Sequence, residues 1–230
     1  MTNVRDYLVN DLKDLNSIIT KEQDALDSMD SNNIVITTDP LKELGITFDP
    51  TTKEDIPTLE NIVYPTNRSK YRIYRAYRIN NYKNDIFNNW LDKQKDKTTQ
   101  LLIHGTRNAN VFSILKSDLL VRPSNAATIS GAAYGEGIYH SFHTDKSLNY
   151  TGYDNDKIFF IQNVHMGKPY TYNGWYRDSK DISRENMNYK YLSSKGYDSL
   201  YVKPGDGLLN SEYIVYNQEQ TVTNYLIWLK

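Results

Sequence analysis

The sequence predicts an α+β fold with a largely antiparallel sheet. About seven short stretches are rich in apolar, aromatic and β-branched residues, as strands are, while few stretches have helical periodicity. Strands and helices do not alternate regularly along the chain, as they would in a parallel fold. The composition, with 39% apolar and 13% aromatic residues, is typical of a folded globular chain.

Charge and cysteine content exclude several classes of protein. The formal net charge of −1 gives no overall basic field to attract nucleic acid or an anionic membrane. The chain has no cysteine, which excludes disulfides, cysteine zinc modules and thiolate catalysis. No apolar run is long enough to span a bilayer, and the first residues do not resemble a signal peptide. We therefore expect a soluble, cytoplasmic protein, with export by another route left open.

The first 64 residues are predicted to form a helix and a connector. Apolar residues recur at helical spacing over residues 4–29, which predicts one helix docked on the main body, dimerising as a coiled coil, or regulating an active site. Over residues 31–66 the signals are weak and four prolines interrupt them. We place the boundary at Tyr64-Pro65, with residues 1–64 as an N-terminal helical, regulatory-like segment and residues 65–230 as the main domain.

The main domain is predicted to begin with a strand over residues 70–79, KYRIYRAYRI, on which Arg72 and Arg78 share a face opposite Arg75. Such a strand could bind a nucleic-acid backbone, but the net charge of −1 favours a strand with one face simply exposed to solvent. An amphipathic helix follows over residues 80–95.

Residues 100–116, QLLIHGTRNANVFSILK, predict a strand, a turn and a helix. The apolar strand ends abruptly at His104-Gly105-Thr106, where polar side chains and free backbone are well placed to meet a ligand. A lone His at a strand end can equally be structural. A further strand is predicted to lead into a loop through Arg122 and Pro123.

A glycine-rich stretch, residues 131–150, follows as GAAYGEGIYHSFHTDKSLNY. Its three glycines suit a loop that bends sharply or lies against a ligand. Thr144 is predicted to cap a short helix, which places Ser147 and Tyr150 on one face.

Strands are then predicted over residues 157–167 and 196–202, with a loop over residues 168–183, and two strands over residues 210–217 and 221–229 close the chain. Glu212 enters the first of these closing strands. A carboxylate there costs free energy unless it is exposed to solvent, paired with a cation or required for function.

Four motifs in this order resemble the catalytic domain of the poly(ADP-ribose) polymerase family, in the diphtheria-toxin-like branch of ADP-ribosyltransferases. They are His-Gly-Thr after a strand, Gly-x-Gly-Ile-Tyr, Lys-Ser-x-Asn-Tyr and Asn-Ser-Glu-Tyr-Ile-Val-Tyr. They span residues 101–217, and the flanking strands extend the likeness to residues 65–230. The resemblance implies a split antiparallel β-sheet and an enzyme that consumes NAD and needs no metal.

The resemblance implies a triad of His104, Tyr139 and Glu212. His104 would hold the 2′-hydroxyl of the nicotinamide ribose, and Tyr139 and Tyr150 would stack on the nicotinamide ring. Glu212 would stabilise the positive charge that develops on the ribose and orient the acceptor. The remaining implied contacts with NAD are Gly105 and Ser147 at the carboxamide, Lys146 beside Glu212, Thr106 and Asn110 at the adenine ribose, Arg122 at the pyrophosphate, and Gly137 in the loop.

Several features differ from the family or leave alternatives open. His140 and Ser141 replace a common Phe-Ala, and without cysteine the chain cannot build the zinc modules that sense DNA breaks. Glutamate at position 212 permits polymer formation, while mono-ADP-ribosylation, including a toxin-like role, is the close alternative. An inactive NAD-binding or ADP-ribose-binding module is a further one, and a metal hydrolase built on His140, His143 and Asp145 is disfavoured by their spacing. The expected acceptor is a protein, the chain itself included, or nucleic acid.

Overall fold

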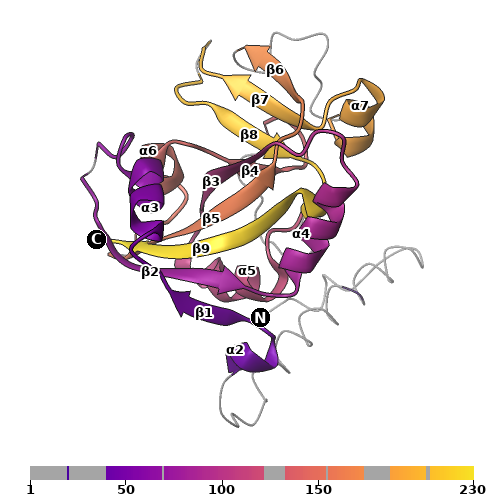
Figure 1. Ribbon diagram of the computed structural model, residues 1–230. Coiled ribbons are helices and arrows are strands. Elements are labelled where there is room, and N and C mark those ends of the chain that lie inside the picture. The colour runs from indigo at the N-terminus through magenta and orange to yellow at the C-terminus, as the bar shows by residue number, and fades with distance from the viewer. Residues whose placement is uncertain are drawn as a thin grey trace, which may run out of the picture. The chain divides into compact units, whose positions relative to one another are not determined.

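The computed structural model describes residue 20 and residues 40–68, 70–121, 133–153, 155–173, 187–205 and 208–230 (Figure 1). By its contacts the chain divides into two compact units, and nearly all described residues belong to the one formed by Leu41–Val121 and Ser130–Lys230. Apart from Thr20, the predicted helix over residues 4–29 lies outside the described residues, as does the predicted pyrophosphate contact Arg122.

The described strands form two sheets. Sheet A has the order β1-β2-β9-β5-β3 and is entirely antiparallel. Sheet B has the order β4-β8-β7-β6, in which only β6 and β7 run parallel. The strand bounds are β1 Thr47–Pro50, β2 Ile73–Asn80, β3 Thr99–Gly105, β4 Ile138–His140, β5 Lys157–His165, β6 Pro169–Asn173, β7 Ser199–Lys203, β8 Glu212–Val215 and β9 Thr221–Leu229. The predicted α+β fold with a mostly antiparallel sheet is confirmed.

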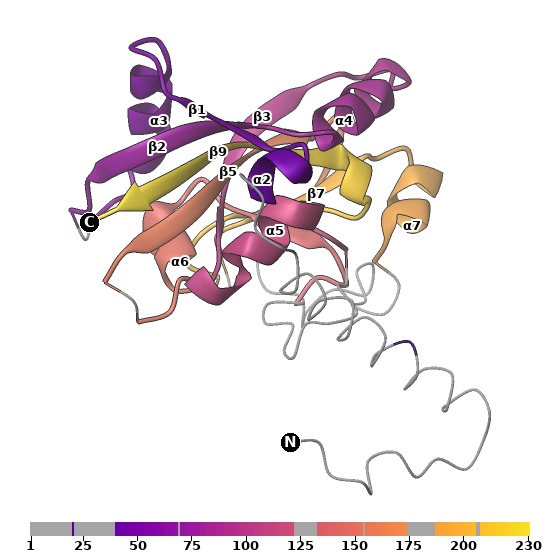
Figure 2. The same cartoon turned by 90° about the horizontal axis from the view of Figure 1, so that it is seen from below.

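Helices cover both faces of sheet A, with α3 on one side and α5 on the other (Figure 2). Because both faces are buried, β5 carries a continuous apolar run in which Phe159 faces the α3 side and Phe160 the α5 side. The helix bounds are α2 Pro40–Glu43, α3 Asp55–Val63, α4 Lys83–Asp92, η2 Asn108–Asn110, α5 Val111–Ser117, α6 Thr144–Leu148, α7 Tyr189–Ser194 and η4 Gln218–Gln220.

Two parts of the chain differ from the sequence-based expectations. Residues 40–63, assigned to a connector, supply α2, β1 and α3 to the same unit as the sheets, and β1 pairs with β2. The predicted loop over residues 168–183 begins with strand β6. The two closing strands belong to different sheets, since β8 joins sheet B and β9 joins sheet A. The turn between them is η4, whose capping box uses Asn217.

A buried carboxylate ties α3 to sheet A. Asp55 is 4% exposed and accepts hydrogen bonds from the Tyr225 hydroxyl on β9 at 2.8 Å and from the Arg78 guanidinium on β2. Burial alone would raise the pKa of Asp55, but the backbone N–H of Thr52, the Tyr225 hydroxyl and Arg78 together lower this pKa from 3.8 to about 2.

This depressed pKa predicts an acid-sensitive contribution to stability. The unfolded chain protonates Asp55 first, so the stabilisation is complete above about pH 4 and is lost as the pH falls through 2. Its size is about 2 kcal/mol. In urea unfolding, Asp55→Asn should therefore show a smaller loss of stability between pH 4 and pH 2 than the wild type. The exposed Asp85 gives a matched control, Asp85→Asn, and equal pH dependence of both variants would contradict the expectation.

Candidate active site

The end of β3 presents His104 in a defined tautomer. Its Nδ1 lies 3.0 Å from the Tyr139 carbonyl oxygen on β4, and since a carbonyl only accepts, Nδ1 carries the proton. Burial lowers the pKa of His104 below its ordinary value of 6.5, so the ring is neutral at pH 7. The other ring nitrogen, Nε2, is then a hydrogen-bond acceptor.

Gly105 allows α6 to approach β3 closely. A Cβ at this position would lie 2.1 Å from the Ser147 carbonyl oxygen, a distance at which no side chain fits. The α6 helix is held there by Thr144, whose hydroxyl donates to the Val63 carbonyl at 2.7 Å and whose N–H donates to the Thr66 hydroxyl at 2.9 Å.

The N-cap of α6 is His143, so the prediction that Thr144 caps this helix is wrong. The Thr144 hydroxyl instead bonds the end of α3. This anchor could not be predicted from the sequence, because Val63 and Thr66 lie in the stretch with weak signals that was interpreted as a connector.

Strand pairing in sheet B sets Tyr139 and Glu212 on one face. Tyr139 on β4 pairs with Ile214 on β8, and Glu212 lies two residues before Ile214, so all three side chains point to the same side. Gly137 leads into β4 where a Cβ would meet Ile214 Cγ2 at 2.5 Å. The Tyr139 hydroxyl donates to the Gly135 carbonyl at 2.7 Å.

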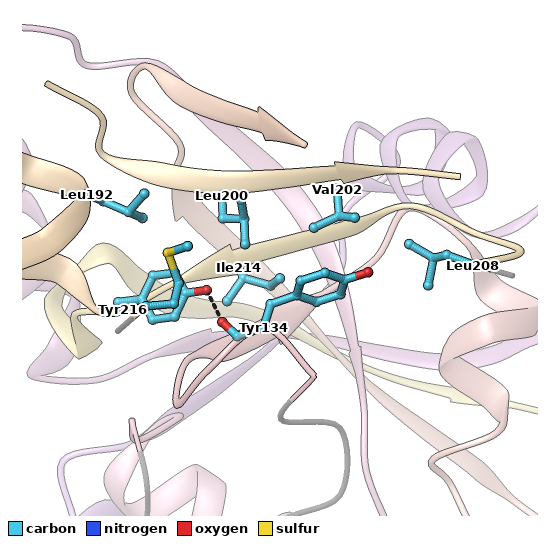
Figure 3. Packing of buried hydrophobic residues seen from close by; sticks show 8 residues of the cluster. Tyr134, Leu192, Leu200, Val202, Leu208, Ile214 and Tyr216 are labelled. Carbon is cyan, nitrogen blue, oxygen red and sulfur yellow. Dashed lines mark hydrogen bonds between the residues drawn. The ribbon is translucent and has the colours of Figure 1, made fainter. Parts of the chain in front are cut away.

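A buried cluster supports this face of sheet B. Leu200 and Val202 on β7 point toward Ile214, and Tyr134 and Tyr216 pack beside them (Figure 3). The Tyr216 hydroxyl donates to the Tyr134 carbonyl, which ties the loop before β4 to the end of β8. The Tyr134 N–H in turn donates to the Tyr139 hydroxyl at 2.9 Å, so Tyr139 is held by the same loop.

The two sheets meet beside His104. Ile103 on β3 and Ser141 after β4 exchange two backbone hydrogen bonds, at 2.9 and 3.0 Å. These bonds bring His104 from sheet A to the strands of sheet B that carry Tyr139 and Glu212.

Glu212 is paired within the protein. Its carboxylate forms an ion pair with the Lys146 ammonium of α6, and the two side chains are only 12% and 10% exposed. The Lys146 Nζ also lies 3.3 Å from the Ser211 carbonyl and 3.4 Å from that of Asn210. Burial raises the pKa of Glu212, and the Lys146 charge opposes that shift. The pair explains how a carboxylate is tolerated at the start of β8.

Of the other predicted site residues, Tyr150 lies near Glu212. Burial raises the pKa of Tyr150, and the negative charge of Glu212 raises it further. Thr106 and Asn110 lie together after β3, because the Asn110 amide donates to the Thr106 hydroxyl at 3.0 Å. Ser147 is buried on α6 next to Gly105.

His140, His143 and Asp145 do not converge. His140 is buried with its Nε2 3.5 Å from the Thr221 hydroxyl, whereas His143 precedes α6 and Asp145 accepts from the Arg68 N–H at 3.1 Å. Within the described ranges, no three His, Asp or Glu side chains gather as metal ligands would.

The arrangement has the chemistry for binding and cleaving a charged sugar compound. A neutral imidazole acceptor, a buried carboxylate and its ammonium partner, and a glycine backbone come from β3, β8 and α6. A carboxylate in a water-poor setting stabilises positive charge strongly, as bond cleavage at an anomeric carbon requires.

Comparison with known proteins agrees with this chemistry. Residues 53–230 match the model of the poly(ADP-ribose) polymerase catalytic domain. The poly(ADP-ribose) polymerase-like protein 100L of Invertebrate iridescent virus 6 is 46% identical over 158 residues, which cover 69% of this chain and 84% of that protein. Poly(ADP-ribose) polymerase 2 of Arabidopsis thaliana is 29% identical over 58% of this chain, and the protein mono-ADP-ribosyltransferase PARP3 of Gallus gallus is 28% identical over 56%.

The fold and the site thus define an NAD-dependent ADP-ribosyltransferase. The chain belongs to the poly(ADP-ribose) polymerase catalytic-domain family. It spans 24% and 28% of the plant and chicken relatives. Among the described residues, no helix is both long and apolar enough to cross a membrane.

Proposed function

We propose that this protein cleaves NAD at the nicotinamide glycosidic bond and transfers ADP-ribose to a protein acceptor, itself included, or to nucleic acid, and that it can elongate poly(ADP-ribose). Two observations support the proposal: the His104 ring of sheet A bonds the Tyr139 carbonyl of sheet B, and Glu212 of the neighbouring strand forms a buried ion pair with Lys146. A neutral imidazole acceptor and a carboxylate are the two groups that a ribose needs when its anomeric carbon becomes positive.

Each residue has a proposed role in the reaction. His104 Nε2 accepts a hydrogen bond from the 2′-hydroxyl of the nicotinamide ribose. Glu212 stabilises the positive charge on that ribose and orients the acceptor, and Lys146 keeps Glu212 ionised in its buried position. The Gly105 backbone and the Ser147 hydroxyl bind the carboxamide, which the close approach of β3 and α6 favours. The rings of Tyr139 and Tyr150 enclose the nicotinamide.

We propose that the adenosine half of NAD binds the residues that follow β3. Thr106 and Asn110 are proposed to bind the adenine ribose, which their mutual hydrogen bond favours by placing both side chains together. Arg122 remains the proposed pyrophosphate contact, and Gly137 the glycine that lets the loop lie against the dinucleotide.

Mono-ADP-ribosylation is the second candidate, because one relative is named a mono-ADP-ribosyltransferase and others are named poly(ADP-ribose) polymerases. Incubation with labelled NAD, followed by gel electrophoresis, separates them. A ladder indicates polymer and a single band indicates mono-transfer. Nicotinamide release without labelled protein indicates a glycohydrolase, and neither release nor label indicates an inactive binding module. Label that persists unchanged in His104→Ala and Glu212→Ala would remove the proposed mechanism.

We further propose that the segment before the catalytic domain, residues 1–64 in the sequence-based division, restrains the NAD site. Deleting residues 1–39 keeps α3 with the sheet, and we expect turnover to rise at least about twofold, since a restrained site is competent only part of the time. Turnover and NAD affinity are measured against a chain whose first 39 residues are replaced by a Gly/Ser linker of equal length. Unchanged values in both chains would contradict restraint.

A further inference from the structure

One end of sheet A gathers exposed basic side chains. The start of β2, the end of β9, the start of β5 and the turn after β3 lie side by side there, where the C-terminus is marked in Figures 1 and 2. The strands are joined in this order by the pairs Ile73–Leu229, Leu229–Lys157 and Phe159–Gly105. We call this surface the basic end; its exposed basic residues are Arg68, Lys70, Arg72, Arg75, Arg107 and Lys230.

Aromatic rings lie among these charges. The Arg75 guanidinium lies 5.9 Å from the Tyr74 ring centroid and 6.0 Å from that of Trp228, and Arg72 lies 5.3 Å from the Tyr64 centroid. Tyr74 is 45% exposed, whereas Phe159, Phe160 and Tyr225 of the same sheet are buried. Each of these two guanidinium groups therefore lies close to at least one partly exposed aromatic ring.

A hollow of about 650 Å³ adjoins these rings. It is lined by Asn108, Asn155, Asp156 and Lys230; burial raises the pKa of Tyr74, and the nearby Asp156 raises this pKa further. The Asn108 amide donates to the Asp156 carbonyl at 3.2 Å, while its own Oδ1 is buried and has no hydrogen-bond partner among the described residues. Amide and carboxylate groups of this kind can bond the edges of bases and sugar hydroxyls.

Most of these charges are not neutralised within the protein. Arg68, which precedes β2, forms an ion pair with Asp145 at 4.0 Å. No carboxylate within the described ranges forms an ion pair with Arg72, Arg75, Arg107 or Lys230. The formal net charge of −1 for the whole chain thus conceals a local excess of positive charge.

We propose that the basic end binds single-stranded nucleic acid. Clustered guanidinium groups neutralise a phosphate backbone, and exposed rings beside them give unpaired bases a surface for stacking. An acidic peptide would satisfy the charges but would leave the rings and the amide-lined hollow unused. A duplex would satisfy the charges but would keep its bases stacked inside. Binding of nucleic acid is measured without NAD and is therefore independent of the proposed transferase activity.

The test is fluorescence anisotropy with a labelled 20-nucleotide RNA of mixed sequence at several salt concentrations. Arg72→Ala/Arg75→Ala removes two charges from the basic end, and Lys93→Ala/Lys95→Ala removes two exposed charges at the end of α4, beyond the opposite end of β2. We expect the first pair to weaken binding about tenfold at low salt and to reduce the salt slope by about 1.4. The control pair should change affinity less than about twofold.

A second variant separates stacking from charge. Tyr74→Ala leaves the charge unchanged and should weaken binding of the single strand several-fold, while binding to a duplex of the same sequence changes little. Thermal unfolding of each variant establishes that it is folded. Absence of binding by the wild type at 50 mM salt, equal losses in both double variants, or equally tight binding of poly-glutamate would each overturn the proposal.

Discussion

Replacing Glu212 by Gln is expected to slow ADP-ribose transfer about 10²- to 10⁴-fold. The amide keeps the shape of the side chain but carries no negative charge for the ribose as its glycosidic bond breaks. Since the positive charge on the ribose develops only in the transition state, kcat should fall much more than NAD affinity. Initial rates of nicotinamide release, together with NAD binding by calorimetry, measure the two effects separately.

Two further variants test whether the loss of rate has another cause, such as unfolding. Glu219→Gln removes an exposed carboxylate in η4, shortly after β8, and should leave the rate within about twofold of the wild type. Glu212→Gln also leaves Lys146 buried without its partner, which destabilises the fold. Glu212→Leu/Lys146→Met should recover stability but not activity. A rate loss under about tenfold in folded Glu212→Gln would contradict the assigned role.

Gly105→Ala is expected to destabilise the fold by about 3 kcal/mol. The added methyl group would lie 2.1 Å from the Ser147 carbonyl oxygen, so β3 and α6 must separate. Separation also moves Lys146 of α6 away from the strands that carry His104 and Glu212, so NAD turnover should be lost along with stability. Urea unfolding gives the change in free energy, and initial rates below the unfolding transition give the change in activity.

Gly45→Ala provides the contrast, because Gly45 has a φ of +66° and open space around its hypothetical Cβ. Its cost is conformational only, at about 1 kcal/mol. If Gly105→Ala costs no more than Gly45→Ala, the close approach of β3 and α6 is not the reason for glycine at position 105.

The sequence predicted where His104 and Glu212 lie along their strands better than it predicted which strands pair. The apolar run before His104 and the apolar residues after Glu212 placed both residues at strand ends, which is where β3 ends and β8 begins. The pairing of Lys146 with Glu212 was implied by the family resemblance, and the structure contains that ion pair. The local sequence pattern is informative at His104 and Glu212 because each is a polar residue at the end of an apolar strand.

Short elements and strand partners could not be predicted in the same way. Residues 210–217 and 221–229 look alike as strands, yet β8 joins sheet B and β9 joins sheet A. Periodicity says which residues form a strand but not which strand lies beside it. Elements such as β1, β6 and α7 have four to six residues each, and their stability comes from packing that is distant in sequence.

The hydrogen bonds between Ile103 and Ser141 allow the contact between the two sheets to be followed by hydrogen exchange. Both backbone amides are donors in the junction that joins the sheet of His104 to the strands of Tyr139 and Glu212. Any opening of that junction exposes both protons to deuterium, and it also moves His104 away from the strands of Tyr139 and Glu212, its proposed partners in binding NAD. Exchange rates at these two positions would therefore measure how often the proposed catalytic residues are assembled, without any substrate being present.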